Sequence, residues 1–337
     1  TRVSSSAASD VYKRQENLSK TLPVIRDFDN RTYIKEDAGK ILVGIFESQS
    51  IPAWDKINKV PEDFSFGEFQ ENFEHFEPYL ATAIKRFPVL ETAGIRKFFS
   101  GPESFTPDTN TLLGEVPEVK NFFVCCGLNS IGIGSGGGVG KVTAEWLING
   151  HINEDIFCYD IKRFQKFHSD LGFIKKRITE SLGDLYGMHW PFKQHKTSRN
   201  IKTLPYHDEL KSFGACFGVS GGYERPMWFA LDGEKTEYEY SYNYQNWYPS
   251  AEYETNNTIK NVGLFDLTPF SKFEIRSEKA HKELQKICTA NIKNEPGKCI
   301  YTHMLNPDGG IETDLTIVCV DKDLSLIHIS EPTRRLV

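Results

Sequence analysis

The stretch "GLNSIGIGSGGGVGKVTAEW", from Gly127 to Trp146, decides how the N-terminal part of the chain folds. It follows the apolar run "NFFVCC", which predicts a buried strand. It continues into "KVTAEWLING", which predicts a helix closing at Gly150. We expect the glycine cluster between them to form a loop, so the order strand, loop and helix indicates an α/β domain.

A nucleotide P-loop is the first interpretation of this stretch, and the spacing excludes it. Gly140 and Lys141 resemble the end of the motif. A P-loop also needs glycine where Ser135 stands, and serine or threonine where Val142 stands to bind magnesium. Both requirements fail.

Two other interpretations remain open on the residues alone. Gly132, Gly134 and Gly137 satisfy the dinucleotide pattern GxGxxG, with Asp160 as a candidate ribose ligand. In that fold, however, the strand runs directly into the first glycine, whereas residues 128–131 intervene here. The other interpretation places a cofactor at the helix N-terminus, where unpaired N–H groups and the helix dipole stabilise negative charge such as that of a reduced flavin.

The flanking sequence adds elements on both sides. "RTYIKEDAGKILVGIFE" predicts two strands around a tight "AGK" turn. A long amphipathic helix is predicted next from apolar side chains at helical spacing, namely Phe69, Phe73, Phe76, Tyr79, Leu80, Ile84 and Phe87. We expect mostly helix from Asp155 to Leu204, and beyond His207 helices and strands that end in a hairpin turning at Pro307 to Gly310.

Composition limits the class of protein. The 337 residues are 39% hydrophobic with a net charge of −6, which suits about two globular domains and argues against nucleic acid as a partner. No apolar stretch is long enough to cross a membrane. Seven cysteines without a CxxC pair, including the adjacent Cys125 and Cys126, indicate buried thiols rather than a disulfide framework or a metal site.

The two ends of the chain share an unusual relation at the level of codons. One back-translation of "DVYKRQ", Asp10 to Gln15, is the reverse complement of one back-translation of "LSLIHI", Leu324 to Ile329. Both match a transposon adapter used in sequencing libraries. We therefore expect residues 1–15 and 324–337 to be adapter-derived and not native, and we exclude them from the predicted fold. The natural segment, residues 16–323, is then expected to be a fragment.

Several blocks occur in the order found in one known family. They are "LPVIRD", "GPESFTPD", "GLNSIGIGSGGGVGK", "AEWLINGH", "YDIKRF", "GYERPMWF" and "MLNPDGGIETDLT". In these blocks the chain resembles the sarcosine and dimethylglycine dehydrogenases over almost the whole natural segment. The regulatory subunit of pyruvate dehydrogenase phosphatase is a relative that shares many of them.

The resemblance implies a fold of mixed α/β and α+β class in consecutive parts. Residues 16–154 would be the C-terminal part of an FAD-dependent amine oxidoreductase domain, and residues 155–207 a central connecting region. Residues 208–323 would be the start of an aminomethyltransferase-like, folate-binding domain.

The resemblance also implies cofactors and site residues. FAD would lie against the loop formed by Gly127, Leu128, Asn129, Ser130, Ile131 and Gly132, with Pro107 and Asp108 lining the same region. Tetrahydrofolate would lie near Asp314. The base and the flavin-attachment residue are expected upstream of Glu16, so no catalytic residue is nominated.

The implied activity is the oxidative demethylation of sarcosine in the mitochondrial matrix. The one-carbon unit would pass to tetrahydrofolate and the electrons to electron-transfer flavoprotein. Two alternatives stay open, namely a non-catalytic regulatory subunit of the phosphatase and a dehydrogenase acting on dimethylglycine. The resemblance to the sarcosine enzyme is carried by "YDIKRF", "RNIKTLPYHDEL", "EYEYSYNY" and "GGIETDLT".

Overall fold

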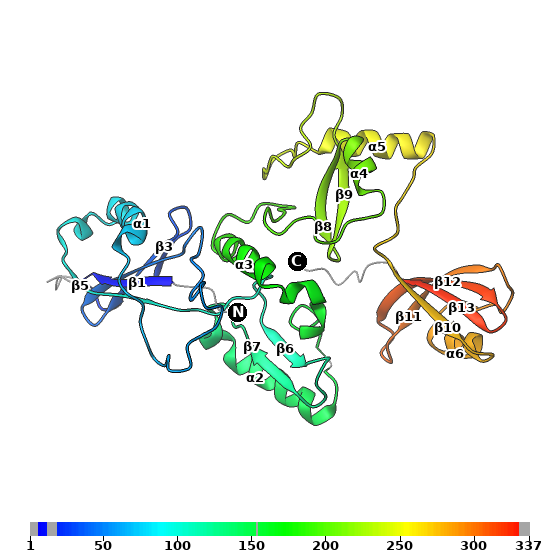
Figure 1. The fold of residues 1–337 in the computed structure, drawn as a ribbon, viewed down its shortest axis with the longest axis horizontal. Helices are drawn as coiled ribbons and strands as arrows, with labels where there is room; N and C mark the ends of the chain where they lie inside the picture. The colour runs from blue at the N-terminus through cyan, green and yellow to red at the C-terminus, as the bar shows by residue number, and fades with distance from the viewer. Residues whose placement is uncertain (1–5, 12–18, 153, 330–337) are drawn as a thin grey trace. The chain divides into compact units, whose positions relative to one another are not determined.

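The computed structural model describes residues 6–11, 19–152 and 154–329, and the side chains of 19–152 and 154–329. Two units can be distinguished (Figure 1). The first contains the described residues up to 201 together with 239–245, and the second contains 202–238 and the described residues from 246 onward. Among the described residues, no helix combines the length and apolar character needed to cross a bilayer.

An antiparallel sheet in the order β2-β3-β4-β1-β5 organises the start of the first unit. Its strands are β1 (Ser6–Val11), β2 (Ile25–Asp27), β3 (Thr32–Asp37), β4 (Lys40–Ile45) and β5 (Ile95–Gly101). β3 and β4 are joined through Ala38 and Gly39, whose φ angles of 50° and 80° suit a two-residue hairpin turn. The predicted strand pair is confirmed.

Helix α1 (Phe73–Arg86) covers one face of this sheet. The shared core contains Ile34, Ile41, Val43, Ile45, Phe76, Ala83, Leu90 and Phe98, with the short helix η1 (Pro88–Thr92) beside it. The helix is shorter than predicted, because Asn72 caps it by accepting the His75 N–H. Phe69 instead donates its backbone N–H to Ser100 of β5.

The glycine stretch belongs to a hairpin and helix, β6 (Leu112–Glu115), β7 (Phe123–Cys126) and α2 (Gly132–Asn149). The glycine cluster is therefore helical and not a loop, which corrects the prediction. Glycine has low helix propensity, but α2 is anchored at its far end, where the Trp146 ring packs on Phe123. Cys125 and Cys126 are exposed, contrary to expectation, because β6 is the only described partner of β7.

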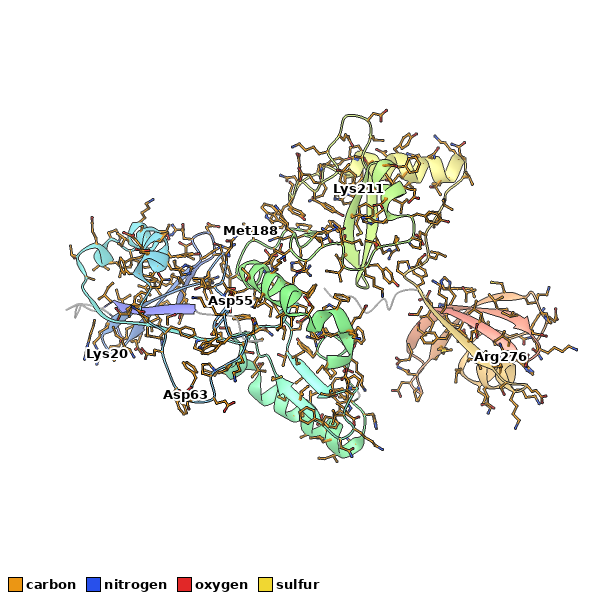
Figure 2. The ribbon with its side chains drawn as sticks, viewed as in Figure 1. Lys20, Asp55, Asp63, Met188, Lys211 and Arg276 are labelled. Carbon is orange, nitrogen blue, oxygen red and sulfur yellow. The ribbon has the colours of Figure 1, made fainter. Side chains whose placement is uncertain are left out.

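Residues 155–204 contain less helix than predicted. Two short 3-10 helices, η2 (Ile161–Arg163) and η3 (Lys166–Ser169), precede α3 (Leu171–Leu185). Asp170 caps α3 by accepting the Phe173 N–H, and Ile178 and Leu182 pack against Phe105. Residues 188–204 follow α3 and form turns and bends but no helix. Met188, at the start of this segment, is labelled in Figure 2.

The second unit contains α4 (His207–Ser212), the hairpin β8 (Ala215–Ser220) with β9 (Tyr223–Phe229), and α5 (Tyr248–Lys260). It also contains an antiparallel sheet, β10 (Ser271–Arg276), β13 (Leu324–Ile329), β12 (Ile311–Asp321) and β11 (Cys299–Leu305), in that order. Helix α6 (Ala280–Ile287) packs Leu284 against one face of the sheet. The hairpin predicted at Pro307–Gly310 joins β11 to β12 and is confirmed.

Two segments that we excluded from the fold form strands in the structure. Residues 6–11 are β1, between β4 and β5, and residues 324–329 are β13, between β10 and β12. The physical reason is clearest for β13, whose alternating sequence "LSLIHI" buries Ile327 in the core and completes two strand pairings. The structure therefore places in sheets two segments that the predicted fold left out, whereas the adapter origin stays a prediction.

Candidate cofactor sites

The loop between β7 and α2 has an unusual backbone. Gly127, Asn129 and Ser130 all adopt the left-handed region, with φ angles of 64°, 48° and 65°. Side-chain-bearing residues rarely enter this region, so two in succession need support from the surrounding structure.

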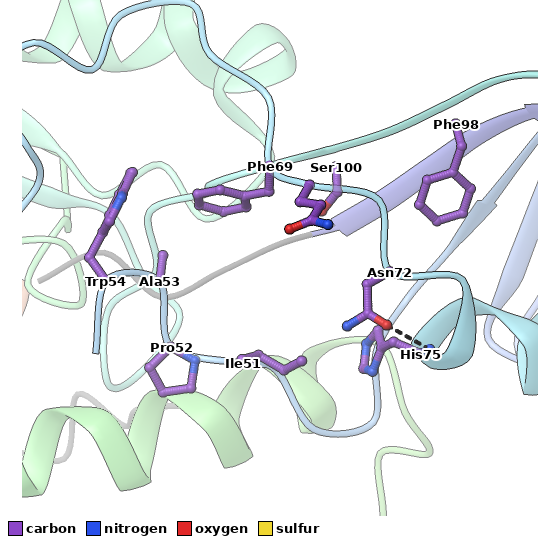
Figure 3. A pocket seen from close by; sticks show the side chains of 10 residues that line it. Ile51, Pro52, Ala53, Trp54, Phe69, Asn72, His75, Phe98 and Ser100 are labelled. Atoms are coloured by element: carbon purple, nitrogen blue, oxygen red, sulfur yellow. Dashed lines mark hydrogen bonds between the residues drawn. The ribbon is translucent and has the colours of Figure 1, made fainter. Parts of the chain in front are cut away.

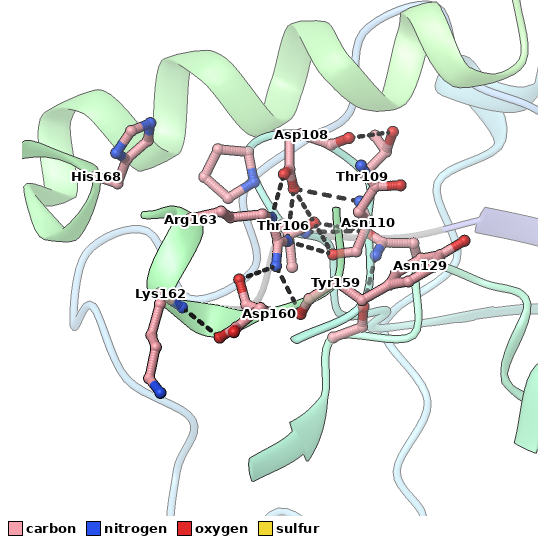
Figure 4. Close-up of polar contacts among 12 residues, drawn as sticks. Thr106, Asp108, Thr109, Asn110, Asn129, Tyr159, Asp160, Lys162, Arg163 and His168 are labelled. Carbon is pink, nitrogen blue, oxygen red and sulfur yellow. Dashed lines mark hydrogen bonds and ion pairs between the residues drawn. The ribbon is translucent and has the colours of Figure 1, made fainter. Parts of the chain in front are cut away.

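That support comes from the Asn129 side chain, which is only 2% exposed. Its Oδ1 accepts the Thr106 backbone N–H at 2.9 Å, and its Nδ2 donates to the Gly127 carbonyl at 2.5 Å. The amide therefore fastens the loop to the turn at residues 105–110 (Figure 4). Asn129 is one of the predicted FAD-binding residues. Its side chain is used in hydrogen bonds that stabilise the loop, so we expect it to contribute to a ligand site through its backbone.

The same turn is held from the other side by a buried arginine (Figure 4). The side chain of Arg163 is 4% exposed, and it donates from Nε and Nη2 to the two carboxylate oxygens of Asp108 at 2.6 and 3.0 Å. It also donates to the carbonyls of Tyr159, Asp160 and Asn110. Two-point Arg–carboxylate pairs fix geometry as well as charge, so η2 and the turn form one rigid support for the loop.

The start of α2 stays accessible on this support. Among the residues that the structure describes, no side chain caps its first turn, and no acidic residue lies within that turn. A Cβ added at Gly134, Gly136, Gly137 or Gly138 would meet nothing within 4 Å, and Ile133 is fully exposed. A Cβ added at Gly132 would lie 3.1 Å from Leu128 Cδ1, while Ile131 is 55% exposed. An uncapped, glycine-lined helix start fits a negatively charged planar group that approaches the backbone closely.

A separate cavity of about 230 Å³ lies near α1 and β5 (Figure 3). It has aromatic walls and borders His75, whose Nε2 lies 3.0 Å from the buried Glu47 carboxylate. Burial lowers the pKa of His75. Its lining does not include the loop at 127–132 and consists of Ile51, Pro52, Ala53, Trp54, Phe69, Gln70, Asn72, His75, Phe98 and Ser100.

A second cavity of about 260 Å³ borders Asp108, Asp184 and His195. Glu180, Asp184 and His195 have ligand atoms within 4.8 Å of one another, a spacing that could surround a metal ion. Here Glu180 accepts the backbone N–H groups of Lys196 and Thr197, and Asp184 pairs with Lys193. The carboxylates thus attach residues 193–197 to α3.

Asp314 lies on β12 of the second unit, opposite His303 of β11. Its Oδ2 accepts the Tyr301 hydroxyl at 3.1 Å, and Tyr301 is 61% exposed. Leu315 and Ile317 point into the core, so Asp314 and Tyr301 lie on the opposite face of the sheet. A carboxylate beside an exposed ring can bind a flat heterocycle through hydrogen bonds and stacking.

Sequence reasoning identified the loop but missed part of its surroundings. Arg163 lay within the quoted block "YDIKRF", yet nothing local linked it to Asp108, which is 55 positions away. Glu103, which accepts the Ser130 hydroxyl at 2.9 Å, was also missed. Contacts between residues this distant in sequence leave no periodic signal.

Family models match three consecutive parts of the chain. Residues 5–146 match the FAD dependent oxidoreductase model, 149–203 the FAD dependent oxidoreductase central domain, and 206–335 the GCVT N-terminal domain.

Curated relatives align across most of the chain. It is 40% identical to 4-methylaminobutanoate oxidase (formaldehyde-forming) of Paenarthrobacter nicotinovorans, with 95% of the chain and 39% of that protein covered. It is 34% identical to human mitochondrial sarcosine dehydrogenase, with 91% and 36% covered. It is also 34% identical to the mouse mitochondrial regulatory subunit of pyruvate dehydrogenase phosphatase, with 90% and 35% covered.

The chain spans somewhat more than a third of the length of these relatives. The matches confirm the predicted fold class, and they confirm FAD and a folate-type domain at the level of the families. The chain therefore combines an FAD-dependent oxidoreductase region with an aminomethyltransferase-like GCVT N-terminal domain.

Proposed function

We propose that the protein containing this chain oxidises an N-methyl amine with FAD and passes the one-carbon unit to tetrahydrofolate. The observation that carries the proposal is the loop at 127–132, whose buried Asn129 is bonded inward while the first turn of α2 is left uncapped. The family matches and the names of the relatives support the same chemistry.

When bound, FAD accepts a hydride equivalent from the N-methyl carbon of the substrate. The first N–H groups of α2 would stabilise the negative charge that the reduced ring then carries. The bonds from Asn129 and Arg163 keep this helix start in place before reaction, so little reorganisation is needed when the charge develops.

FAD is the only oxidant that the first step would need. A C–H bond of the N-methyl group breaks, its electron pair leaves with the hydrogen, and the amine becomes an iminium ion. Water would convert the iminium ion to formaldehyde, the demethylated amine and a proton, whereas tetrahydrofolate, when bound, would supply nitrogen atoms that take up the carbon instead. Asp314 is proposed to hold the folate through its carboxylate, beside Tyr301.

Sarcosine is the predicted substrate, and 4-methylaminobutanoate is a second candidate supported by the bacterial relative. Electron-transfer flavoprotein as acceptor and a matrix location accompany the sarcosine form of the proposal, since that relative is mitochondrial. A non-catalytic regulatory role is the alternative, because the chain is as similar to the phosphatase subunit as to the human sarcosine dehydrogenase, at 34% identity in both cases.

The test uses the full-length protein encoded by the gene from which this chain derives. Its visible flavin absorbance is recorded without oxygen, before and after adding sarcosine, 4-methylaminobutanoate or dimethylglycine. We expect bleaching by at least one amine, and the most effective amine identifies the substrate. A protein without flavin, or a flavin that no amine reduces, contradicts the proposal and favours the regulatory alternative.

A further inference from the structure

The cavity near α1 and β5 is lined by residues that neither candidate cofactor site uses (Figure 3). Its most buried lining residues are Phe98 and Ser100 of β5, each 7% exposed. Phe98 shares a core with Phe76 of α1, and side chains two positions apart on a strand lie on the same face. The cavity therefore lies on the face of the first sheet that α1 covers.

Aromatic rings form the walls of this cavity. The Trp54 ring packs edge-on against Phe69, with centroids 5.3 Å apart, and against Phe64 at 4.8 Å. Trp54 also has a left-handed φ of 53°, which bulky residues rarely adopt and which is found most often at ligand sites. An apolar cavity of ~150 Å³ accepts benzene, so the volume of about 230 Å³ is sufficient for an aromatic ring with one polar substituent.

A buried hydroxyl in the cavity has no partner. Ser100 lines the cavity, and its Oγ makes no hydrogen bond to any residue that the structure describes. Most buried polar side-chain atoms in proteins are hydrogen-bonded, because an unpaired one costs free energy. A ligand with a hydrogen-bonding atom in the cavity would satisfy the Ser100 hydroxyl.

His75 adds an acceptor to the lining. Its Nε2 lies 3.0 Å from the carboxylate of Glu47, whose side chain is 1% exposed. A carboxylate only accepts hydrogen bonds, so Nε2 donates and Nδ1 is left with the lone pair. Burial lowers the pKa of His75, which favours this neutral form of the ring. Within the described part of the chain Nδ1 has no partner, so it is available to accept from a ligand.

The composition of the lining determines the charge of a suitable ligand. The lining residues given above include no aspartate, glutamate, lysine or arginine. A charged group that entered the cavity would lose its hydration without gaining an opposite charge. Asn72 uses Oδ1 to cap α1, so its Nδ2 remains as an uncharged donor at the cavity. The lining therefore favours an uncharged ligand.

We propose that this cavity binds an uncharged aromatic molecule that carries both a hydrogen-bond donor and an acceptor, as an aromatic carboxamide does. The ring of the ligand would pack against Trp54, Phe69 and Phe98. Its N–H group would donate to Nδ1 of His75, and its carbonyl would accept from the Ser100 hydroxyl. The inference goes beyond the proposed function and does not depend on it, because no group of either cofactor site takes part.

The first experiment needs no variant. The 337-residue chain is titrated by calorimetry with benzamide, benzoate and toluene, which differ only in the group attached to the ring. We expect benzamide to bind at least ~10-fold more tightly than benzoate, because the charge is not compensated. Benzamide should also bind roughly 3- to 10-fold more tightly than toluene, which makes no hydrogen bond. No detectable binding of benzamide, or an affinity no higher than that of either comparator, overturns the proposal.

NMR spectra of the ¹⁵N-labelled chain locate the bound probe. The five tryptophans each give one indole N–H signal, and Trp54→Phe assigns that of Trp54. We expect benzamide to shift the Trp54 signal and to leave unchanged that of Trp146, which packs on Phe123 away from the cavity lining. Saturable binding without a shift of the Trp54 signal would place the probe elsewhere and refute this site.

Ser100→Ala tests the hydrogen bond, with Ser65→Ala as the matched control. Ser65 is exposed and does not line the cavity. We expect Ser100→Ala to raise the Kd of benzamide by roughly 2- to 10-fold, the effect of one neutral hydrogen bond, and to leave the Kd of toluene unchanged. Ser65→Ala should change neither Kd by more than about twofold.

Toluene also reports whether the cavity is intact in each variant, because it requires only the aromatic walls. If Ser100→Ala leaves the Kd of benzamide unchanged, or weakens benzamide and toluene alike, the proposed hydrogen bond is absent and the inference is wrong. These measurements use neither flavin nor an amine substrate. Their failure therefore leaves the proposed function to its own test.

Discussion

The loop at 127–132 and the sheet face that carries Asp314 are two proposed cofactor sites that are built differently. In the loop, the buried side chain of Asn129 is bonded inward, and backbone N–H groups are left for the ligand. On the sheet face, the regular backbone pairing of β11 and β12 is complete, and the side chains of Tyr301 and Asp314 face outward. An irregular backbone needs hydrogen bonds from side chains to hold its conformation. A regular strand pair is held by its own backbone hydrogen bonds, so its side chains are not needed for that purpose.

The comparison predicts that substitutions at the two sites differ in kind. Substitutions in the loop or its supports should lower the free energy of unfolding, and any loss of cofactor would follow from that destabilisation. Damage to the sheet face should alter ligand binding and titration with little effect on folding.

The largest effect is expected for Arg163→Gln. The substitution removes a buried cation from the Asp108 carboxylate and leaves that charge with the Thr106 hydroxyl and the Asn110 N–H. We expect the free energy of unfolding of the first unit to fall by about 3 kcal/mol, as for other broken buried pairs. Urea unfolding measures it.

Lys141→Gln is the matched control for that experiment. Lys141 forms an exposed pair with Glu145 on α2, and its loss should cost no more than about 0.5 kcal/mol. If Arg163→Gln and Lys141→Gln destabilise the chain equally, the turn at 105–110 is not the rigid support described above.

The second effect is expected for Asn129→Ala, at about 1–3 kcal/mol, because two buried groups lose their hydrogen-bond partner. Asn129→Gly loses the same bonds but tolerates the left-handed φ of 48°, so it should be less destabilising than Asn129→Ala by about 1 kcal/mol. Asn149→Ala, at the exposed end of α2, is the control. Equal unfolding midpoints for Asn129→Ala and Asn149→Ala would refute the anchoring role of Asn129.

Local patterns predicted the parts of the fold that depend on local physics. The β3–β4 turn at Ala38–Gly39 and the hairpin at Pro307–Gly310 follow from turn chemistry that neighbouring residues determine. Helix α1 was predicted too long because helical spacing continues through Phe69, while the competing bond of its N–H to Ser100 arises only in the folded sheet. The glycine cluster was expected to be a loop because glycine disfavours helix, but the packing of Trp146 decides otherwise.

The candidate sites divide in the same way. The loop at 127–132 could be located from sequence through the family resemblance, whereas the glycine spacing alone left two interpretations open. The Asp108–Arg163 fork, the Ser130–Glu103 bond and the His75–Glu47 contact join distant segments, and no spacing rule indicates them. Predicting them requires knowing which faces of the sheet and helices meet.

The smallest effect on stability is expected for Asp314→Asn, at no more than about 0.5 kcal/mol, because the residue lies outside the core. Its effect on titration should be distinct. The bond to Asp314 is the main cause that raises the pKa of the exposed Tyr301, since a nearby carboxylate favours the neutral phenol. Asp314→Asn removes that charge, so the pKa of Tyr301 should fall toward its ordinary value.

The direction of the pH dependence follows from linkage. Because the pKa of Tyr301 is raised in the folded chain, any stabilisation from this pair is present below the ordinary tyrosine pKa and disappears as the pH rises through the raised value. NMR titration of ¹³C-labelled tyrosine, assigned with Tyr301→Phe, measures the shift, and Glu312→Gln on the same strand serves as the control. If the pKa of Tyr301 is the same with Asp314→Asn, the two side chains do not interact in solution. The sheet face would then lack the hydrogen-bonded pair that distinguishes it from the loop at 127–132.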